Sequence, residues 1–402
     1  MVEEAASKTA FRLLRIAILS SIFSILLFYH TFHDTSWTVD TNDESILAPH
    51  LRSDYKIISK EGLSACLLVN DENPRLPEWL AYHYHVLPLR SIIVAVDPAS
   101  RYQPNEILNR WVPMGMEVEI WEDADYLGNQ GGVCKSTVFE ECLRRHRWRQ
   151  TTFMARCMAE LKNRNKTWTL LIDVDEYISS DALDWGRGAY KGAEPPPNAF
   201  PDFDKHETIH DILKHKGEAK PCFPFTRQLY GAKEDYNHTY WRDMAPYGFD
   251  DADFVTLKYR WRASKNKVFV NRWQKTIIDV SRIPMKDLIR SFGMTVHLPL
   301  PKHCAADPRK FRTTLLRANH YVDSYESYSY RKDARSHEKE NYEKWESKSK
   351  GATDEMDMDL TPWLKGFVAS VGKQTAKKLL RETGVFVRKE ADSRRNATDT
   401  SS

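Results

Sequence analysis

The stretch Trp168-Thr169-Leu170-Leu171-Ile172-Asp173-Val174-Asp175-Glu176 joins a short apolar run to acidic residues without a break. An apolar run of this length that ends in polar residues predicts a buried β-strand. In an open α/β sheet, ligands bind just beyond the carboxyl ends of the strands. Because side chains alternate along extended backbone, we expect Asp173 and Asp175 to share one side, with Val174 on the other. The stretch therefore predicts a strand that carries two carboxylates to a ligand site.

Further apolar runs and helical patterns alternate on the amino-terminal side of this stretch. The predicted strands are 64–70, 91–97 and 117–121, and the predicted helices are 76–87, 107–111 and a long one from about 135 to 161. Strands that alternate with helices favour a parallel, doubly wound sheet. We therefore predict an α/β fold in which a Rossmann-like, mostly parallel sheet is flanked by helices.

The pattern changes after residue 184. Residues 186–201 are rich in Gly and Pro and predict a surface loop, whereas 223–297 contains aromatic, strand-like pieces without clear helices. Helices are expected again near 325–344 and 364–380. The predicted organisation is a catalytic domain (61–345, with halves 61–184 and 185–345), a carboxyl-terminal extension (346–388) and a polar tail (389–402).

Composition narrows the class of protein. The 402 residues include 59 Lys and Arg against 56 Asp and Glu, and the formal charge of +3 is too small to indicate a nucleic-acid binder. With 16 Gly and 19 Pro, the chain is neither collagen-like nor of low complexity. The 12 Trp and 18 Tyr are typical of proteins that bind sugars or other amphipathic surfaces.

The amino terminus contains a candidate membrane segment at 13–32, which as a helix spans about 30 Å, the thickness of one hydrocarbon core. Basic residues precede it and acidic residues follow it, which predicts a cytoplasmic tail (1–12) and a lumenal stem (33–60). A cleavable signal peptide is the main alternative, but no small-x-small cleavage site follows. We therefore expect a single-pass type II protein of the Golgi or endoplasmic reticulum membrane.

Six cysteines occur without C-x-x-C spacing. In an oxidising compartment one or more pairs are expected to be bridged, and 15 complete pairings are possible. Buried free thiols are the alternative, especially for Cys66 and Cys157. Sequons at Asn165, Asn237 and Asn396 are candidate glycan sites of a glycoprotein.

The D-x-D at Asp173 and Asp175 suits a divalent cation. Carboxylate oxygens are the ligands that Mg²⁺ and Mn²⁺ prefer, and a substrate diphosphate can complete the coordination. The metal then neutralises the charge that grows on a leaving nucleoside diphosphate. A solvated acidic loop is the alternative, but the apolar strand directly before the motif argues against it.

Four ordered blocks between about residues 64 and 333 resemble glycosyltransferase family 92. The segment 168–177 is similar to the family's W-x-x-x-I-D-V-D-E-F, and 72–83 is similar to its opening K-N-E, L-x-E-W and Y-H pattern. Gln150 with Cys157 resembles the helix before D-V-D-E, and 320–332 resembles the closing H-Y-x-x-S-x-E-x-F-x-x-x-K. This chain departs from the family pattern at two places. Residues 70–72 are Asn-Asp-Glu where the family has K-N-E, and residues 97–98 are Asp-Pro where the family has Asp-Asn.

This resemblance implies a GT-A-like fold with a nucleotide-binding half and an acceptor-binding half. Characterised relatives are inverting β-galactosyltransferases that use UDP-galactose and a divalent metal, typically Mn²⁺. Carried over to this chain, the resemblance implies that Asp173 and Asp175 face the ribose and the metal, and that His320 binds the metal. It also implies that the nucleotide sugar is bound by Glu72, Asp97, Asp173 and Lys332. A core position for His320 and a solvated one for Lys332 are the alternatives.

An inverting transfer also requires a general base that takes the proton of the acceptor hydroxyl. Asp250 and Asp251 follow an aromatic pair and are candidates, with a plain acidic turn as the alternative. Glu234, Asp235 and Asp253 are further acids that the acceptor half offers for this role. Three tryptophans could stack on a sugar face, with packing in the core as the alternative: Trp241, Trp261 and Trp273.

Two other functions compete. A phosphohydrolase of the haloacid-dehalogenase type also places D-x-D after a strand, but that strand is the first one, whereas here three strands precede the motif. A membrane-anchored lectin or scaffold would keep the fold without turnover. The sequence favours a metal-dependent glycosyltransferase that uses Mn²⁺ or Mg²⁺, a nucleotide-sugar donor (UDP-galactose by resemblance) and a glycan acceptor, with no nucleic-acid partner.

Overall fold

The computed structural model describes residues 62–180, 220–233, 244–267, 269–271, 273–290, 296–297, 299–304, 316–330 and 342–386. The chain divides into two compact units, 1–59 and 60–402, and every described residue belongs to the second. The expectations for the tail (1–12), the membrane segment (13–32), the stem (33–60), the loop 186–201 and the end of the chain (389–402) fall outside these ranges.

The predicted membrane location is corrected. Within the described ranges, no helix is both long and apolar enough to cross a bilayer. The longest, α5 (Phe139–Asn163), has sufficient length with 25 residues, but it carries Glu140, Glu141 and several arginines. The assignment to a Golgi or endoplasmic reticulum membrane is therefore withdrawn.

Four parallel strands form the amino-terminal half of the sheet. They are β1 (Leu63–Val69), β2 (Leu89–Val96), β3 (Glu117–Trp121) and β4 (Trp168–Leu171), in the order β3-β2-β1-β4. This order is that of a doubly wound sheet, in which the strands run outward from β1 in both directions. The predicted α/β fold with a Rossmann-like, parallel first half is confirmed, and the four strands lie within a few residues of their predicted positions.

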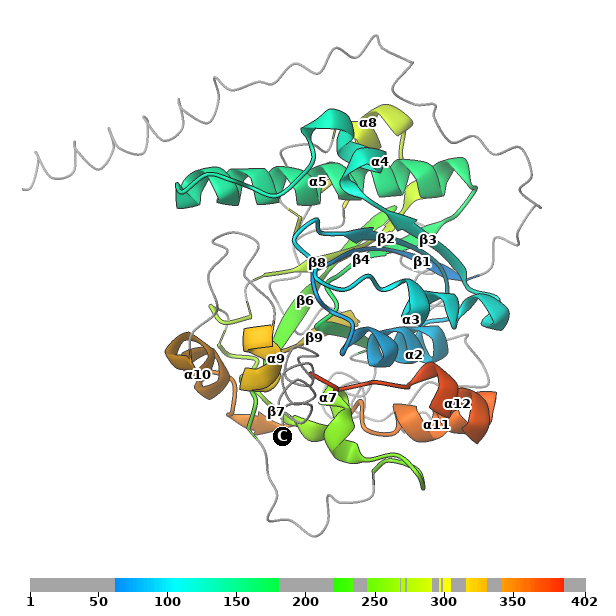
Figure 1. Ribbon diagram of the computed structural model, residues 1–402, viewed down its shortest axis with the longest axis vertical. Helices are drawn as coiled ribbons and strands as arrows, with labels where there is room; N and C mark the ends of the chain where they lie inside the picture. Colours follow the sequence, from blue (N-terminus) through cyan, green and yellow to red (C-terminus); the bar gives the residue numbers. More distant parts are fainter. Residues whose placement is uncertain are drawn as a thin grey trace, which may run out of the picture. The chain divides into compact units, whose positions relative to one another are not determined.

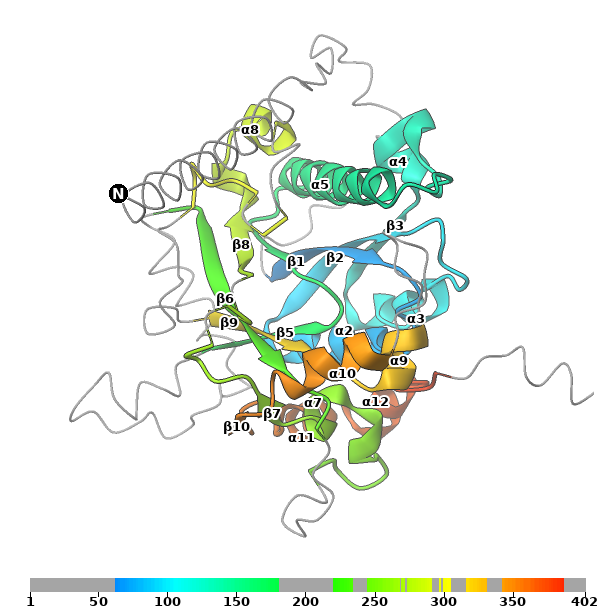
Figure 2. The same cartoon turned by 90° about the vertical axis from the view of Figure 1, so that its left-hand side faces the viewer.

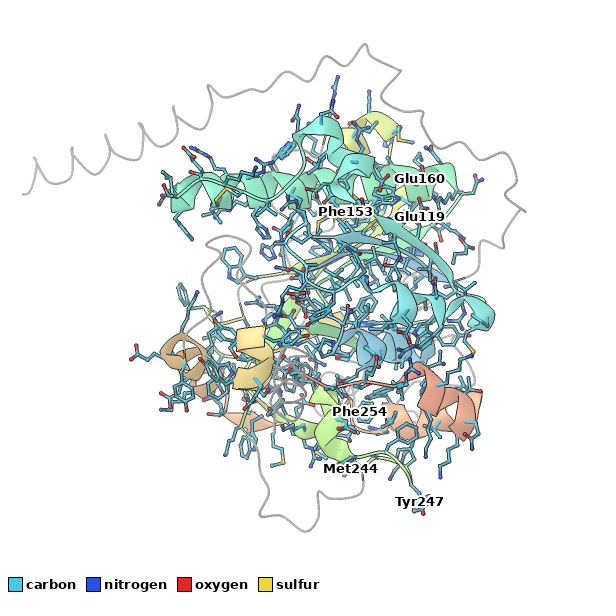
Figure 3. All side chains as sticks on the ribbon, viewed as in Figure 1. Glu119, Phe153, Glu160, Met244, Tyr247 and Phe254 are labelled. Atoms are coloured by element: carbon cyan, nitrogen blue, oxygen red, sulfur yellow. A yellow bond between two sulfur atoms is a disulfide. The ribbon has the colours of Figure 1, made fainter. Side chains whose placement is uncertain are left out.

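Helices cover both faces of this half, α2 (Leu76–Val86) on one face and α5 on the other (Figure 1). The period of two along β1 explains the arrangement, since Leu67 packs in the cluster that contains Trp79 while Cys66 packs with Phe153 of α5. Figure 3 shows Phe153 between α5 and the sheet. The shorter elements of this half are α3 (Asn105–Asn109), η2 (Val112–Met114), α4 (Asp123–Leu127) and η3 (Gly128–Gln130).

All six cysteines are paired. Cys66 of β1 is bonded to Cys157 of α5, and the other disulfides are Cys134–Cys142 and Cys222–Cys304. The free-thiol alternative is therefore wrong for Cys66 and Cys157. Their bond ties the sheet to the long helix across a sequence separation of 91 residues.

Antiparallel strands continue the sheet beyond β4. β8 (Lys275–Asp279) pairs with β4, and β6 (Cys222–Tyr230) pairs with β8. β6 then extends to β9 (Leu316–Tyr321), which it meets in parallel, and β5 (Glu176–Ser180) lies antiparallel on β9 (Figure 2). A short edge is formed by β7 (Trp261–Arg262) and β10 (Glu355–Met356).

The second half also contains short helices where none was expected. They are η6 (Asp251–Asp253), α7 (Val255–Lys258), η7 (Val280–Arg282) and α8 (Met285–Ile289). A single turn of helix is too short to produce a recognisable period in the sequence. The predicted helix near 325–344 corresponds to α9 (Tyr325–Tyr330) and α10 (Tyr342–Lys350), with 331–341 outside the described residues.

The segment 342–386 packs into the second unit. Its α11 (Trp363–Val371) contacts α2, and buried Trp363 donates a hydrogen bond from Nε1 to Oγ1 of Thr256 at 2.8 Å. Gly372, at φ 82°, separates α11 from α12 (Lys373–Leu379), so that the predicted helix 364–380 is two helices.

Candidate metal centre

The turn between β4 and β5 is held from both sides. Indole Nε1 of Trp79 donates to the backbone oxygens of Asp173 and Glu176, each at 3.1 Å. The amide of Tyr321 in β9 donates to the backbone oxygen of Asp175 at 2.9 Å. Val174, between the two aspartates, is buried. These contacts fix the backbone of the D-x-D motif at the carboxyl end of β4.

Asp175, Glu176 and His320 converge beside this turn. The β5–β9 register places Glu176 opposite His320. Imidazole Nδ1 of His320 lies 3.4 Å from Oδ1 of Asp175 and 3.4 Å from Oε1 of Glu176. One ligand atom from each residue lies within 4.8 Å of the others. The structure thus brings together the predicted Asp175 and His320 and adds Glu176.

A buried lysine completes the charge arrangement. Ammonium Nζ of Lys275, at the start of β8, lies 2.6 Å from Oδ2 of Asp173 and 2.9 Å from Oε2 of Glu176. Lys275 is 1% exposed and Glu176 is fully buried, whereas the side chain of Asp173 is half exposed. Asp173, predicted as a metal ligand, therefore pairs with Lys275, and Glu176 stands nearer to His320.

The neighbouring positive charges lower the pKa values of Asp175 and Glu176. Burial raises the pKa of Asp175 and of Glu176, but nearby positive charge outweighs it. For Asp175 the dominant charge is that of His320, and the pKa falls well below its ordinary value. For Glu176 it is Lys275, and the pKa falls to about 2. Both carboxylates are ionised at neutral pH.

The donor set fits a divalent cation. Within the described structure, Oε1 of Glu176 and Nδ1 of His320 are buried without a hydrogen-bond partner, an arrangement that costs free energy unless something binds there. Ligands about 2.1 Å from an octahedral ion lie about 3 Å apart, close to the 3.4 Å found here. Two carboxylates and one imidazole suit Mn²⁺, and Mg²⁺ is the alternative that favours oxygen more strongly.

The predicted nucleotide-binding carboxylates lie at the ends of β1 and β2. Asp97 is buried, its Oδ2 lies 3.1 Å from Nη1 of Arg149, and its Oδ1 accepts from the amide of Ala99. Glu72 is buried and lies 3.4 Å from Nη1 of Arg75. Lys332 lies outside the described residues.

The arginine that holds Asp97 also holds Asp123 of α4. Guanidinium Nη2 of Arg149 lies 2.8 Å from Oδ2 of Asp123 and donates to the backbone oxygen of Gly132 at 2.7 Å. Tyr126 donates to the other oxygen of Asp123 at 2.9 Å. We refer to Asp97, Asp123 and Arg149 as the arginine cluster.

The two candidates for the general base cap turns. Carboxylate oxygens of Asp251 accept from the amides of Met244 and Ala245, and Asp250 accepts from the amide of Ala252. None of the hydrogen bonds or ion pairs described for either residue joins it to the metal ligands. Of the other acids named from the sequence, Glu234 and Asp235 lie outside the described residues.

A cavity of about 270 Å³ lies between the start of α2, the η6–α7 segment and the residues after β9. Arg75 and Asp323, an ion pair at 3.0 Å, form part of its wall. Another wall residue, buried Glu78, accepts hydrogen bonds from the amides of Val255 and Thr256 at 2.8 and 3.0 Å. Burial raises the pKa of Glu78 to about 7 despite these bonds.

Sequence reasoning missed Glu176 and Lys275 as site residues. Glu176 is the fourth residue of the D-V-D-E stretch. It was not predicted as a ligand because the alternation of side chains placed only Asp173 and Asp175 on the same side. Lys275 begins an apolar strand about 100 positions later, and only the β4–β8 pairing, with Leu171 opposite Thr276, places it beside Asp173.

No protein-family model matches this chain, and no curated protein matches it in sequence. Two solved structures are similar at low TM-score. One is S. aureus TarS 1–349, with 10% identity, 83% of this chain and 77% of that chain covered, and a TM-score of 0.28. The other is the mannosyltransferase PcManGT from Pyrobaculum calidifontis in complex with GDP-Man and Mn²⁺, with 10% identity, 96% and 90% covered, and a TM-score of 0.27. At these TM-scores neither similarity carries an argument about activity.

Proposed function

We propose that this chain is a metal-dependent glycosyltransferase that moves a sugar from a nucleotide-sugar donor to a glycan acceptor. The observation that supports this most is the convergence of Asp175, Glu176 and His320 at the carboxyl end of β4. In doubly wound sheets this edge is where nucleotide ligands bind. The resemblance to glycosyltransferase family 92 is part of the same proposal.

The charge of the site supports a divalent cation. Asp175 and Glu176 are ionised, and His320 is neutral when it binds a metal. The two carboxylate charges on these ligands match the charge of a divalent cation. A bound metal supplies charge neutralisation to the departing diphosphate.

The chain's own residues hold and orient this centre. Asp175, Glu176 and His320 would hold the ion, and Lys275 keeps Glu176 ionised and fixes its carboxylate plane through Oε2. Half-exposed Asp173 faces solvent at the rim, where it can meet a donor. Mn²⁺ as the ion, UDP-galactose as the donor and inversion at the anomeric carbon are the finer parts of the proposal and rest on the family resemblance.

The test is turnover of donor sugars by the full chain. A panel of UDP- and GDP-sugars is incubated with Mn²⁺ or with EDTA, and release of the nucleoside diphosphate and calorimetric binding of UDP and GDP are both measured. We expect metal-dependent release from one donor, reduced at least about 100-fold by Asp175→Asn.

The matched control is Asp287→Asn. Asp287 of α8 also pairs with a histidine, His303 at 3.0 Å, but no third ligand joins them among the described residues, so activity should be unchanged. Metal-dependent nucleotide binding without turnover, with any acceptor in a glycan array, would support the lectin or scaffold instead. Failure to bind either nucleotide in the presence of Mn²⁺ would exclude the nucleotide-sugar assignment.

A further inference from the structure

Trp273 lies next to the metal centre on the side of the second half. In the β4–β8 pairing Leu171 lies opposite Thr276, and the two strands are antiparallel. The start of β8 therefore lies beside the end of β4. The residues just before Lys275 are on the same edge of the sheet as Asp173, which follows β4. Trp273 is two positions before Lys275, whose ammonium binds Asp173.

The indole of Trp273 is supported and accessible at the same time. It stacks on the imidazole of His297, with ring centroids 4.8 Å apart and an interplanar angle of 28°. The residue remains 42% exposed. An aromatic side chain of this size is usually buried, because it loses favourable transfer free energy for every part left in water. Exposure of a ring that a neighbour holds in place suggests that a ligand covers it.

His297, on which Trp273 stacks, contacts the backbone next to Lys275. Its Nδ1 lies 3.1 Å from the backbone oxygen of Gln274, between Trp273 and Lys275. Burial and then the charge of Lys275 lower the pKa of His297 to about 4, and Glu176 and Arg227 also act on it. The imidazole is therefore neutral at pH 7, and it presents an uncharged support for the indole close to Glu176.

The position indicates the acceptor and not the donor. The sheet order is β8-β4-β1-β2, so the ends of β1 and β2, where a doubly wound sheet binds a nucleotide, lie on one flank of β4 and Trp273 lies on the other. A sugar that leaves the diphosphate above the end of β4 meets its acceptor on the β8 flank. The C–H face of a pyranose is flat and apolar enough to stack on an indole.

We propose that Trp273 is the platform on which a pyranose ring of the acceptor stacks beside the metal centre. The proposal names the acceptor class for the site and rests on the proposed glycosyltransferase function. Trp261, another candidate from the sequence, is only partly exposed, and Nζ of Lys233 lies over its ring at 3.6 Å. Tyr247 is 90% exposed but projects from the loop before η6, away from the rest of the ribbon in Figure 3.

The experiment measures sugar binding directly. Methyl glycosides of galactose, glucose, mannose and N-acetylglucosamine are added to the full chain with UDP and Mn²⁺, and saturation-transfer NMR reports the bound sugar. Protons stacked over an indole shift upfield, a signature that a merely structural residue does not produce. We expect such a shift for at least one glycoside and about tenfold weaker binding in Trp273→Leu, with partial recovery in Trp273→Phe.

Phe139→Ala is the matched control, since Phe139 is an aromatic residue of α5 with a similar exposure of 48%. Calorimetric binding of UDP and Mn²⁺, measured on every variant, separates this proposal from the function on which it rests. Retained UDP binding together with unchanged glycoside binding in Trp273→Leu would overturn the platform. So would the absence of any upfield-shifted glycoside in the wild-type chain.

Discussion

The arginine cluster and the metal centre are both buried groups of charges at the carboxyl edge of the sheet, yet their hydrogen bonding differs. In the arginine cluster, Arg149 donates to Asp97, Asp123 and a backbone oxygen, and the carboxylates accept further bonds from backbone amides and Tyr126. In the metal centre, Glu176 Oε1 and His320 Nδ1 face each other without a hydrogen bond.

This difference separates a structural group of charges from a binding group. Burying an ion costs several kcal/mol, and the protein recovers that cost only when each oxygen and proton has a partner. In the arginine cluster, other atoms of the chain supply these partners. In the metal centre, Oε1 of Glu176 and Nδ1 of His320 lack such a partner among the described residues, and a bound cation would supply one. This is the physical reason to assign it a ligand.

The largest expected effect is on the arginine cluster. Arg149→Met removes the shared cation and leaves two carboxylates buried without compensation, so we expect the free energy of unfolding to fall by about 3–5 kcal/mol. Urea denaturation measures this loss. The control is Arg144→Met, an exposed arginine of the same helix, which should change stability by less than about 0.5 kcal/mol.

The next effect concerns the metal centre. Mn²⁺ at about 100 times its dissociation constant should raise the free energy of unfolding by about 2.7 kcal/mol, because only the folded chain assembles the three ligands. Thermal and urea denaturation with and without Mn²⁺ measure the increment. Glu176→Gln should abolish it, whereas Asp123→Asn, although less stable, should retain it. An increment that survives in Glu176→Gln would show that the metal binds elsewhere.

The smallest effect concerns Glu78, a buried carboxylate that accepts hydrogen bonds but has no cation beside it in its described contacts. Its pKa rises from 4.5 to about 7, so the folded chain holds the proton more tightly than the unfolded chain. The stabilising contribution is complete below about pH 4.5 and is lost as the pH rises through 7.

Between pH 5 and pH 7 this loss should amount to about 2 kcal/mol relative to Glu78→Gln, which does not titrate. The measurement is the difference in the free energy of unfolding between the wild type and the variant across this range. A difference that does not change with pH would contradict the raised pKa.

The first half of the fold could be predicted because its signals are local. Apolar runs marked β1, β2 and β4, and an alternation of polar and apolar residues marked β3, since a buried strand is mostly apolar and a half-buried strand alternates. The second half could not be predicted in the same way. Single-turn helices such as α7 leave no period, and the partners of β6 lie about 50 and 90 residues away along the chain.

The sequence by itself determined the parallel half of the sheet, the D-x-D motif at the end of β4, and the pairing of Asp175 with a late histidine, because each depends on a short pattern or a recognisable motif. The disulfide partners, Lys275, the use of Glu176 and the place of Trp273 were decided by the tertiary structure alone. Apart from Cys134 and Cys142, which are eight positions apart, these contacts join residues tens to more than a hundred positions apart. Only the folded chain brings them within the few ångströms over which hydrogen bonds and ion pairs act.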